Sequence, residues 1–352
     1  MSKQEVIICQ NFEEDLRKAL AQRSYDKLFV LTDEHTHALC WPRIQHVDVL
    51  QGATCLCIGP GDIHKNLETL AYVWNRLSSE GATRRSLLLN LGGGMVTDLG
   101  GFAAATFKRG IPYINVPTTL LSMVDAAVGG KTGINFNDLK NEIGSFHPAA
   151  TVLIDCQFLR TLDHENILSG YAEMLKHGLI SHTEHWSELV SFDMEHIDYP
   201  RLQQLVGQSV QVKENIVEQD PFEHGIRKAL NLGHTVGHAF ESFALQKQPV
   251  LHGYAVAWGL VCELYLSSLH TDFPKDKLHQ TLHFIKENYG RLEFTCNDYE
   301  TLFNFMKHDK KNLSAGSINF TLLANIGDIR INQTATQDEI YELLDFYSET
   351  MG

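Results

Sequence analysis

Three histidines and one glutamate in the second half of the chain have side chains that bind metals. Glu173 lies in the segment GYAEMLK, His234 and His238 lie in NLGHTVGH, and His252 lies in LHG. Histidines four residues apart share one face of a helix, so both can bind one metal, or one can bind the metal while the other contacts a substrate. Two histidines and a carboxylate leave a coordination position open, as a catalytic zinc ion requires. Any one of these histidines alone would more often be structural, but together the residues favour a metal site.

Basic and amide side chains are interleaved with these candidate ligands. They are Lys176, Lys213, Arg227 and Asn231, the last two again one helical turn apart. Guanidinium and ammonium groups beside a metal can hold a carboxylate or a phosphate. Each of them could instead be a surface charge, but their grouping predicts a pocket for an anion.

A run of three glycines, Gly92 to Gly94, follows the apolar segment 87–91 directly and precedes a helical pattern. Backbone without side chains can approach a pyrophosphate closely, and the following helix offers free N–H groups to the anion. The spacing is not the Gly-x-Gly-x-x-Gly of the usual dinucleotide fingerprint. Taken alone, such a run is either a tight turn or a phosphate cradle.

Two threonines, Thr118 and Thr119, follow the apolar segment 113–116. Their hydroxyls therefore fall at the carboxyl end of a strand, the edge at which open α/β sheets bind ligands. By themselves they could simply cap a helix. Because the glycines are predicted at the same edge, the two motifs together favour a nucleotide site.

The segment 125–133, DAAVGGKTG, looks superficially like a P-loop but lacks the first glycine at the required distance, so we reject an NTPase. What remains is Lys131 on a glycine turn, with Lys140 and Asn141 downstream. Cations so placed suit a phosphate or a nicotinamide cofactor. A solvated loop is the alternative.

The first part of the chain must position these motifs on a sheet. Short β-rich apolar runs alternate with helical patterns at 62–79 and 97–106, which is typical of a parallel sheet flanked by helices. The predicted strands are 27–32, 55–58, 87–91, 113–116 and 151–154. We therefore expect residues 1–160 to form a Rossmann-like, NAD-binding α/β domain.

Beyond about residue 160 the pattern becomes helical. The segment 252–269 is apolar on nearly every side and is expected in the middle of its domain. The other predicted elements are helices at 167–180, 202–219 and 337–347 and a small hairpin formed by 318–323 and 328–331. We expect residues 161–352 to form an all-α domain that binds metal and substrate.

Composition narrows the partners. The 352 residues carry a formal net charge of −14, which argues against a general nucleic-acid or anionic-membrane surface. An anionic small molecule bound in a local cationic pocket remains compatible. No signal peptide or transmembrane run is visible, so we expect a cytoplasmic protein, and its seven cysteines are expected to be reduced core thiols.

From about residue 59 to residue 311 the chain resembles the 3-dehydroquinate synthase family. The motifs that carry the resemblance are GGGMVTD (92–98), FKRG (107–110), VPTTLLSMVDAAVGGKTGIN (116–135), GYAEMLKHG (170–178) and NLGHTVGHAFE (231–241). The resemblance implies that Glu173, His234 and His252 bind Zn²⁺ or Co²⁺, and that His238 faces the substrate. It also implies that Arg109 reaches the site of a neighbouring subunit, and hence a homodimer.

The resemblance assigns two further groups of residues. The positions that it implies for NAD are Asp62, Lys65, Gly94, Met95, Val96, Thr97, Asp98, Thr118, Thr119, Lys131, Lys140, Phe158, Leu159, Arg160 and Thr161. The positions that it implies for the substrate are Asp125, Lys131, Asn141, Lys176, Lys213, Arg227, Asn231 and His238, with one lysine of the pair Lys310 and Lys311.

The implied reaction converts 3-deoxy-D-arabino-heptulosonate 7-phosphate, an anionic sugar-acid phosphate, to 3-dehydroquinate and phosphate in the shikimate pathway. NAD oxidises a ring hydroxyl held on the metal, phosphate leaves, and the same hydride is returned, so NAD is regenerated in each turnover. Tyr254 stands where many relatives have a glutamate, and Ala126 and Ala127 replace the usual serines. These departures keep open a sister cyclase that acts on another heptulose phosphate.

Two other classes compete with this interpretation. A metal-dependent polyol or glycerol-phosphate dehydrogenase would share the two-domain plan, but would produce net NADH. A non-enzymatic sugar-phosphate sensor would have little reason to retain metal ligands together with a nucleotide cradle.

Overall fold

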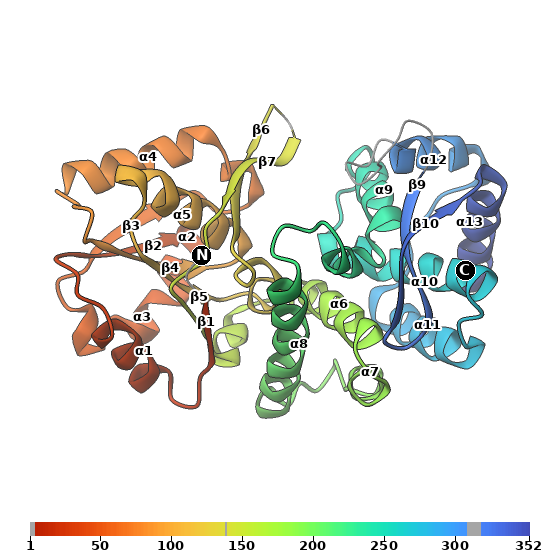
Figure 1. The fold of residues 1–352 in the computed structure, drawn as a ribbon, viewed down its shortest axis with the longest axis horizontal. Coiled ribbons are helices and arrows are strands. Elements are labelled where there is room, and N and C mark those ends of the chain that lie inside the picture. Colours follow the sequence, from red (N-terminus) through yellow and green to blue (C-terminus); the bar gives the residue numbers. More distant parts are fainter. Residues whose placement is uncertain (1–3, 138, 308–317) are drawn as a thin grey trace. The chain divides into compact units, whose positions relative to one another are not determined.

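The protein is described by a computed structural model that covers residues 4–137, 139–307 and 318–352 (Figure 1). The chain divides into two compact units, each made of two segments. The first comprises Met1–Asp163 and Tyr199–Val210, and the second comprises His164–Asp198 and Gln211–Gly352. Residues 199–210, which the sequence pattern groups with the second domain, thus belong to the first unit. Within the described residues, no helix is both long and apolar enough to cross a membrane.

The first unit is built on a six-stranded sheet of order β1-β8-β5-β4-β2-β3, in which every paired strand is parallel. Its strands are β1 (Glu5–Ile8), β2 (Leu28–Asp33), β3 (Thr54–Ile58), β4 (Leu87–Gly92), β5 (Tyr113–Pro117) and β8 (Thr151–Ile154). Five of them coincide with the predicted runs, while the short edge strand β1 was missed. Every residue of β4, β5 and β8 is buried, which is why these strands are mostly apolar. The buried Asn90 of β4 donates a hydrogen bond to Asn115 of β5 at 2.9 Å.

Helices cover both faces of this sheet. The helices of the unit are α1 (Phe12–Ala21), α2 (Glu34–Leu39), α3 (Trp41–Ile44), α4 (Leu67–Ser79) and α5 (Gly94–Thr106). Figure 1 shows α4 and α5 on one face, and α1 and α3 on the other. Right-handed crossovers require this separation, because the connections after β2 and after β4 run toward opposite edges of the sheet. The topological switch point therefore lies between β2 and β4, where open α/β sheets bind their ligands.

The segment that carries Lys131, Lys140 and Asn141, for which the sequence pattern predicts no strand, forms a hairpin. Strands β6 (Lys131–Phe136) and β7 (Leu139–Phe146) pair antiparallel, with Gly133 opposite Gly144. Nearly all of β7 is exposed and its sequence, LKNEIGSF, is largely polar. Neither an apolar run nor a clear alternation reveals such a strand.

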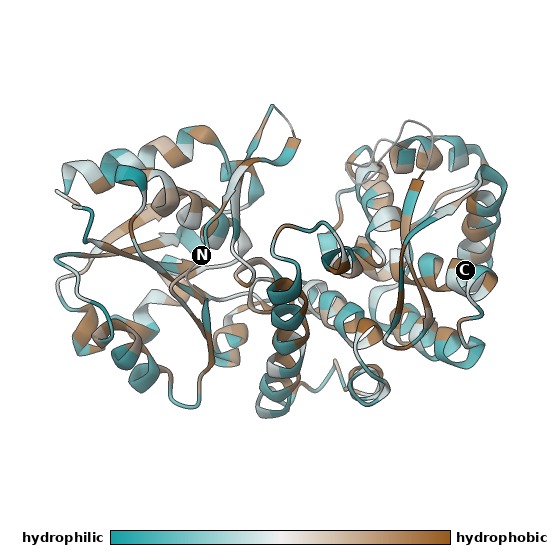
Figure 2. Cartoon of the chain, in the orientation of Figure 1, coloured by the Kyte–Doolittle hydropathy of each residue, from teal (hydrophilic) through white to brown (hydrophobic). Residues whose placement is uncertain are grey.

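The second unit is largely helical, with one two-stranded hairpin, β9 (Ile318–Asn325) and β10 (Asp328–Ala335). Its helices are α6 (His164–Ile180), α7 (Thr183–Val190), α9 (His234–Leu245), α10 (His252–His270), α11 (Lys275–Tyr289), α12 (Tyr299–Lys307) and α13 (Gln337–Met351). Helix α10 packs against α6, α9, α11, α13 and β9, so its expected central place is confirmed. In Figure 2, α10 and β9 carry much of the hydrophobic colour of this unit. The long helix α8 (Tyr199–Gln219) has its first half in one unit and its second half in the other.

Candidate active site

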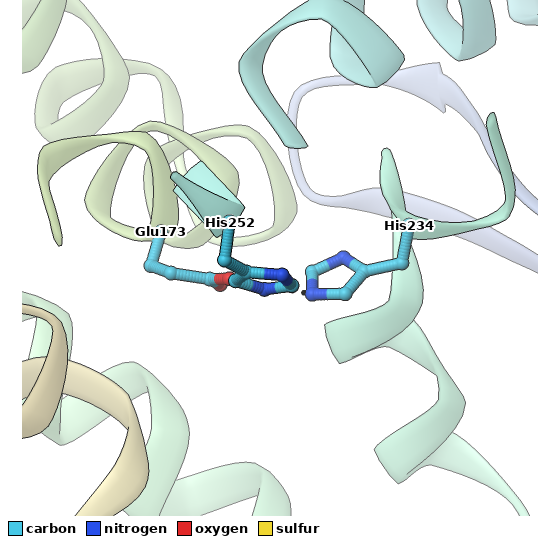
Figure 3. A group of neighbouring side chains, drawn as sticks. All are labelled: Glu173, His234 and His252. Carbon is cyan, nitrogen blue, oxygen red and sulfur yellow. Dashed lines mark ion pairs between the residues drawn. The ribbon is translucent and has the colours of Figure 1, made fainter. Parts of the chain in front are cut away.

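Three helices of the second unit bring Glu173, His234 and His252 together, with one donor atom of each residue within 4.8 Å of the others. Glu173 lies in the middle of α6, whereas His234 and His252 are the first residues of α9 and α10. The Nε2 atoms of both histidines lie 3.3 Å from Oε1 of Glu173. Figure 3 shows the three side chains converging, with the carboxylate and both imidazoles directed at one point.

Glycines allow these helices to approach so closely. A Cβ atom on Gly253, next to His252, would lie 1.8 Å from the carbonyl oxygen of Ser169 on α6. A Cβ atom on Gly259 of α10 would lie 2.0 Å from the carbonyl oxygen of Gly233, the residue before His234. Only glycine fits at such backbone contacts. The glycines thus hold the ligand-bearing ends of α9 and α10 in place.

The ring nitrogens of the two histidines have defined roles. Nδ1 of His234 lies 3.0 Å from the carbonyl oxygen of Leu232, and Nδ1 of His252 lies 3.1 Å from Oε2 of Glu241. A carbonyl and a carboxylate only accept hydrogen bonds, so both Nδ1 atoms must donate. The unprotonated atom of each neutral ring is then Nε2, which faces Glu173.

This arrangement suits a divalent cation. Oε1 of Glu173 is buried and has no hydrogen-bond partner within the described residues, although two imidazole nitrogens lie 3.3 Å away. A carboxylate oxygen facing two imidazole lone pairs is repulsive unless a proton or a cation lies among them. One oxygen and two nitrogen ligands with room for a further ligand are typical of a catalytic zinc site.

Neighbouring charges shift the pKa values of this cluster. Burial would raise the pKa of Glu173, but Lys176, His234 and His252 lower it well below its usual range. Burial lowers the pKa of His252, but the nearby carboxylates of Glu173 and Glu241 raise it to about 9. Lys176 donates to the other oxygen of Glu173, and both side chains of that pair are buried.

The other predicted substrate residues of this unit lie on α8, on α9 and in the segment between them. Lys213 on α8 is 6% exposed and Arg227 is 3% exposed, so neither is an ordinary surface charge. The ring of His238 lies 5.5 Å from that of His234 and 5.9 Å from that of His252. Asn231 donates to Glu223 at 3.0 Å. Arg227 and Asn231 lie on the 3₁₀ segment Ile226–Asn231 rather than on an α-helix, so their predicted spacing of one α-helical turn was wrong.

The loop before Arg227 is ordered by one carboxylate. Asp220 accepts hydrogen bonds from the backbone N–H groups of His224, Gly225 and Arg227 at 2.7–3.1 Å. These hydrogen bonds lower the pKa of Asp220 although desolvation acts to raise it. The Arg227 guanidinium also donates to the carbonyl of Pro221 at 2.6 Å. Sequence reasoning missed Asp220, because nothing in its spacing marks it.

In the first unit, the glycine and threonine motifs do meet at one edge of the sheet. The backbone N–H of Thr118 donates to the carbonyl of Gly92 at 3.0 Å, where β4 and β5 end. A Cβ atom on Gly93 would lie 2.9 Å from the Thr119 side chain. The motifs thus lie at the carboxyl end of β4, which is one of the two strands at the switch point of the sheet.

A buried lysine joins three other predicted positions of that unit. Lys65 is 5% exposed, lies 2.6 Å from Asp98 of α5 and also donates to Asn141 of β7. Asp62 accepts a hydrogen bond from Asn135 at 2.9 Å, so the β6–β7 hairpin is held on the short helical segment Asp62–His64. The structure therefore gathers Asp62, Lys65, Asp98 and Asn141.

The remaining predicted residues of the first unit are more dispersed. The segment Cys156–Thr161 is a 3₁₀ helix in which Phe158 packs on Phe12 and Arg160 lies over the ring of Tyr199. Gly94, Met95, Val96 and Thr97 form the first turn of α5, Asp125 lies in the π-helix Ser122–Ala126, and Lys131 and Lys140 lie on the hairpin strands. Lys310 and Lys311 lie outside the described residues.

Arg109 belongs to a strained basic turn. Lys108 and Arg109 have φ angles of 50° and 68°, in the left-handed region, and Gly110 follows with 111°. Non-glycine residues seldom adopt such angles. Together with Ala82, Thr83 and Arg84, the two basic residues line a surface depression of about 460 Å³.

Comparison with known proteins matches both halves of the chain to one family. Residues 55–169 match the family model for the 3-dehydroquinate synthase N-terminal region, and residues 170–312 match the model for its C-terminal region. A 3-dehydroquinate synthase of Parabacteroides distasonis is 58% identical over 353 residues, covering 100% of both chains.

Two solved structures have the same fold. A 2-epi-5-epi-valiolone synthase from Streptomyces hygroscopicus subsp. jinggangensis, with NAD⁺ and Zn²⁺ bound, is 26% identical, with a TM-score of 0.83 over 99% of this chain and 98% of its own. A 2-deoxy-scyllo-inosose synthase complexed with carbaglucose-6-phosphate, NAD⁺ and Co²⁺ has a TM-score of 0.84 at 20% identity, over 97% of this chain and 95% of its own. The predicted fold, a parallel-sheet domain followed by a largely helical one, is confirmed.

Proposed function

The chain belongs to the 3-dehydroquinate synthase family, and from this premise we propose which of its residues perform the reaction. The activity is the conversion of 3-deoxy-D-arabino-heptulosonate 7-phosphate to 3-dehydroquinate and phosphate. The observation that carries our assignment is the convergence of Glu173, His234 and His252, in which the buried Oε1 of the glutamate faces two imidazole Nε2 atoms.

The family uses NAD and a divalent metal, and we propose zinc bound by Glu173, His234 and His252. A mixed nitrogen and oxygen donor set with an open position suits zinc. When bound, the metal supplies Lewis-acid polarisation of a substrate hydroxyl and carbonyl. Lys176 keeps Glu173 ionised and so ready to bind the metal, since burial alone would favour the protonated acid.

We assign the substrate's anionic groups to the cations of the second unit. Lys176, Lys213 and Arg227 are all nearly buried, and a buried cation binds an anion more strongly than an exposed one does because water screens it less. Asn231 and His238 add hydrogen-bonding groups. His238 is the proposed group that exchanges a proton with the substrate, because its ring lies beside both histidine ligands.

For NAD we propose the edge of the first unit's sheet at Gly92–Gly94 and Thr118. The start of α5 supplies free N–H groups to a pyrophosphate, and Gly92 and Gly93 let the backbone turn closely against Val96 and Thr119 before that helix begins. Asp62 and Lys65 follow β3, and Phe158–Thr161 follow β8, so these proposed NAD positions come after strands of the same parallel sheet. Asp125, Lys131 and Asn141 of this unit are proposed to contact the substrate, as is one of Lys310 and Lys311.

We retain three further predictions as proposals. The protein is a homodimer in the cytoplasm, and Arg109 contributes to the site of the other subunit. The strained turn at Lys108 and Arg109 supports a functional role for Arg109, because residues held in uncommon conformations cluster at functional sites.

The test is to incubate the purified protein with NAD, Zn²⁺ and the heptulosonate 7-phosphate while following phosphate, 3-dehydroquinate and absorbance of NADH. We expect equal amounts of phosphate and 3-dehydroquinate without net NADH. His252→Ala should abolish both products, whereas His283→Ala, which removes an exposed histidine from α11, should not. Net NADH would indicate a dehydrogenase instead, and turnover only of another heptulose phosphate would indicate a sister cyclase.

A further inference from the structure

The proposed function gives no role to Glu241, a carboxylate that contacts one of the two candidate histidine ligands. Glu241 is on α9, two helical turns after His234, and is 9% exposed. Its Oε2 lies 3.1 Å from Nδ1 of His252, the first residue of α10. One helix thus carries a candidate ligand at its start and, two turns later, the partner of the other histidine.

Glu241 cannot be a further ligand of the same cation. Nδ1 and Nε2 are separated by the ring carbon between them and direct their bonds away from each other. Since Nε2 of His252 faces Glu173, the Glu241 carboxylate lies on the side of the ring that faces away from the candidate metal position. Its effect must therefore act through the imidazole.

The two histidines differ in the partner of Nδ1. His234 donates to the neutral carbonyl of Leu232, whereas His252 donates to the charged carboxylate of Glu241. A carboxylate holds the Nδ1–H tautomer more firmly and makes Nε2 a better electron donor. The burial of Glu241 strengthens this hydrogen bond, since little water competes for it.

We propose that Glu241 is a positioning residue for His252, which it holds with Nε2 directed at Glu173 so that the site binds a divalent cation tightly. The inference rests on the metal site proposed above. It also gives a reason for Glu241, the last residue of the NLGHTVGHAFE segment. This residue is a buried acid on the mostly apolar helix α9.

The test measures metal binding rather than activity. Metal-free wild type, Glu241→Ala and Glu241→Gln are titrated with Zn²⁺ against a chromophoric chelator, and the visible spectrum of the Co²⁺ form is recorded. We expect Glu241→Ala to weaken Zn²⁺ binding by about 10–100-fold, the usual effect of removing such a partner, and to change the Co²⁺ spectrum. Glu241→Gln keeps an acceptor without its charge, and should weaken binding by roughly fivefold.

The chain offers a matched control. His270, at the other end of α10, pairs with Glu339 of α13 at 2.8 Å, so Glu339→Gln alters the same kind of contact away from the metal. This variant should bind Zn²⁺ within about twofold of wild type, because an exposed pair of this kind contributes little. Thermal unfolding of the metal-free proteins shows whether each variant is folded.

Zn²⁺ affinity within twofold of wild type in a folded Glu241→Ala protein would overturn the inference. Should the alanine variant not fold, Glu241→Gln decides alone, and an unchanged affinity in that variant has the same meaning. Unchanged affinity in His252→Ala would instead overturn the metal site itself, and with it the inference. The two failures are therefore distinguishable.

Discussion

Lys176 and Glu173 form an ion pair one helical turn apart on α6, with side chains that are 1% and 0% exposed. Such a pair is costly to break, since removing one partner leaves the other charge buried and uncompensated. The lysine therefore stabilises the fold, in addition to making the substrate contact that we propose for it.

Lys176→Met is expected to lower the free energy of unfolding of the metal-free protein by about 3–5 kcal/mol. Zn²⁺ should recover part of this loss, because a cation at the site also compensates Glu173. Chemical denaturation with and without a chelator measures both effects. Lys18→Met breaks an exposed ion pair with Glu14 and should change stability by at most about 1 kcal/mol. Equal stability of Lys176→Met and wild type in chelator would contradict the expectation.

The close contact of Gly253 with Ser169 predicts that Gly253→Ala separates α10 from α6. The new methyl group would meet a backbone carbonyl that cannot turn away, so we expect a loss of about 1–3 kcal/mol or more, together with weaker metal binding. Gly207→Ala on α8 is the matched control. Its Cβ would meet only Ile8 at 3.5 Å, an ordinary contact, so this variant should be neutral or more stable by about 0.4–1 kcal/mol. Thermal unfolding compares the two, and similar melting temperatures for both would refute the prediction.

Asp220→Ala should loosen the loop that carries Arg227. We expect faster hydrogen exchange at the amides of Gly225 and Arg227, and a KM for the sugar-acid phosphate raised by about tenfold, the scale of one charge-assisted contact. Asp193→Ala removes similar backbone hydrogen bonds from Glu195 and His196 elsewhere in the unit, and should leave KM unchanged.

The pH dependence of this loop follows from the lowered pKa of Asp220. The stabilising effect is present in full above the ordinary aspartate pKa of about 3.9, and is lost as the pH falls through the lower value of the folded protein. Hydrogen exchange of the loop at neutral pH should thus differ between wild type and Asp220→Ala, and the difference should disappear in strong acid. A difference that grows with acidity would disprove this assignment.

Thiol reactivity should separate the seven cysteines. All are free, but burial raises the pKa of Cys9, Cys156 and Cys262, whereas Cys296 is exposed. Because only the thiolate reacts, an alkylating reagent at pH 8 should modify Cys296 first. Peptide mass spectrometry identifies the site, and Cys296→Ser should remove the fast reaction. Equally rapid labelling of Cys9 in the folded protein would rule the prediction out.

The sequence predicted the buried parts of the sheet well for a physical reason. Strand β4 is buried on both faces, so it is apolar apart from Asn90 and is bounded by glycine. Strand β1 has four residues, one of them an exposed glutamate, and β7 is mostly polar and exposed, so neither shows the period of a strand. The hairpin of β6 and β7 depends on cross-strand pairing, which composition does not encode.

The candidate site was predicted to the same extent and with the same limit. Residue types marked Glu173, His234, His238 and His252 as candidates, and the family resemblance then selected Glu173, His234 and His252 as the expected ligands. They did not reveal Glu241 as a partner of His252, because that contact joins two helices whose approach depends on glycine packing. Similarly, the contact between Lys65 and Asn141 links residues far apart in sequence and could be seen only in the folded unit.

The position of helix α8 in the chain affects when each unit can complete its folding during synthesis. Its first part, Tyr199–Val210, completes the first unit, yet residues 164–198, which precede it, belong to the second. During synthesis, the nascent chain must therefore present a portion of the later unit before the earlier one has all of its packing partners. The Gln203 side chain on α8 donates a hydrogen bond to the carbonyl of Cys9 at 2.6 Å and accepts one from the N–H of Cys156 at 3.0 Å. A fragment that ends at residue 163 therefore leaves these two backbone groups without this partner. A single cut in the gene cannot separate the two units cleanly.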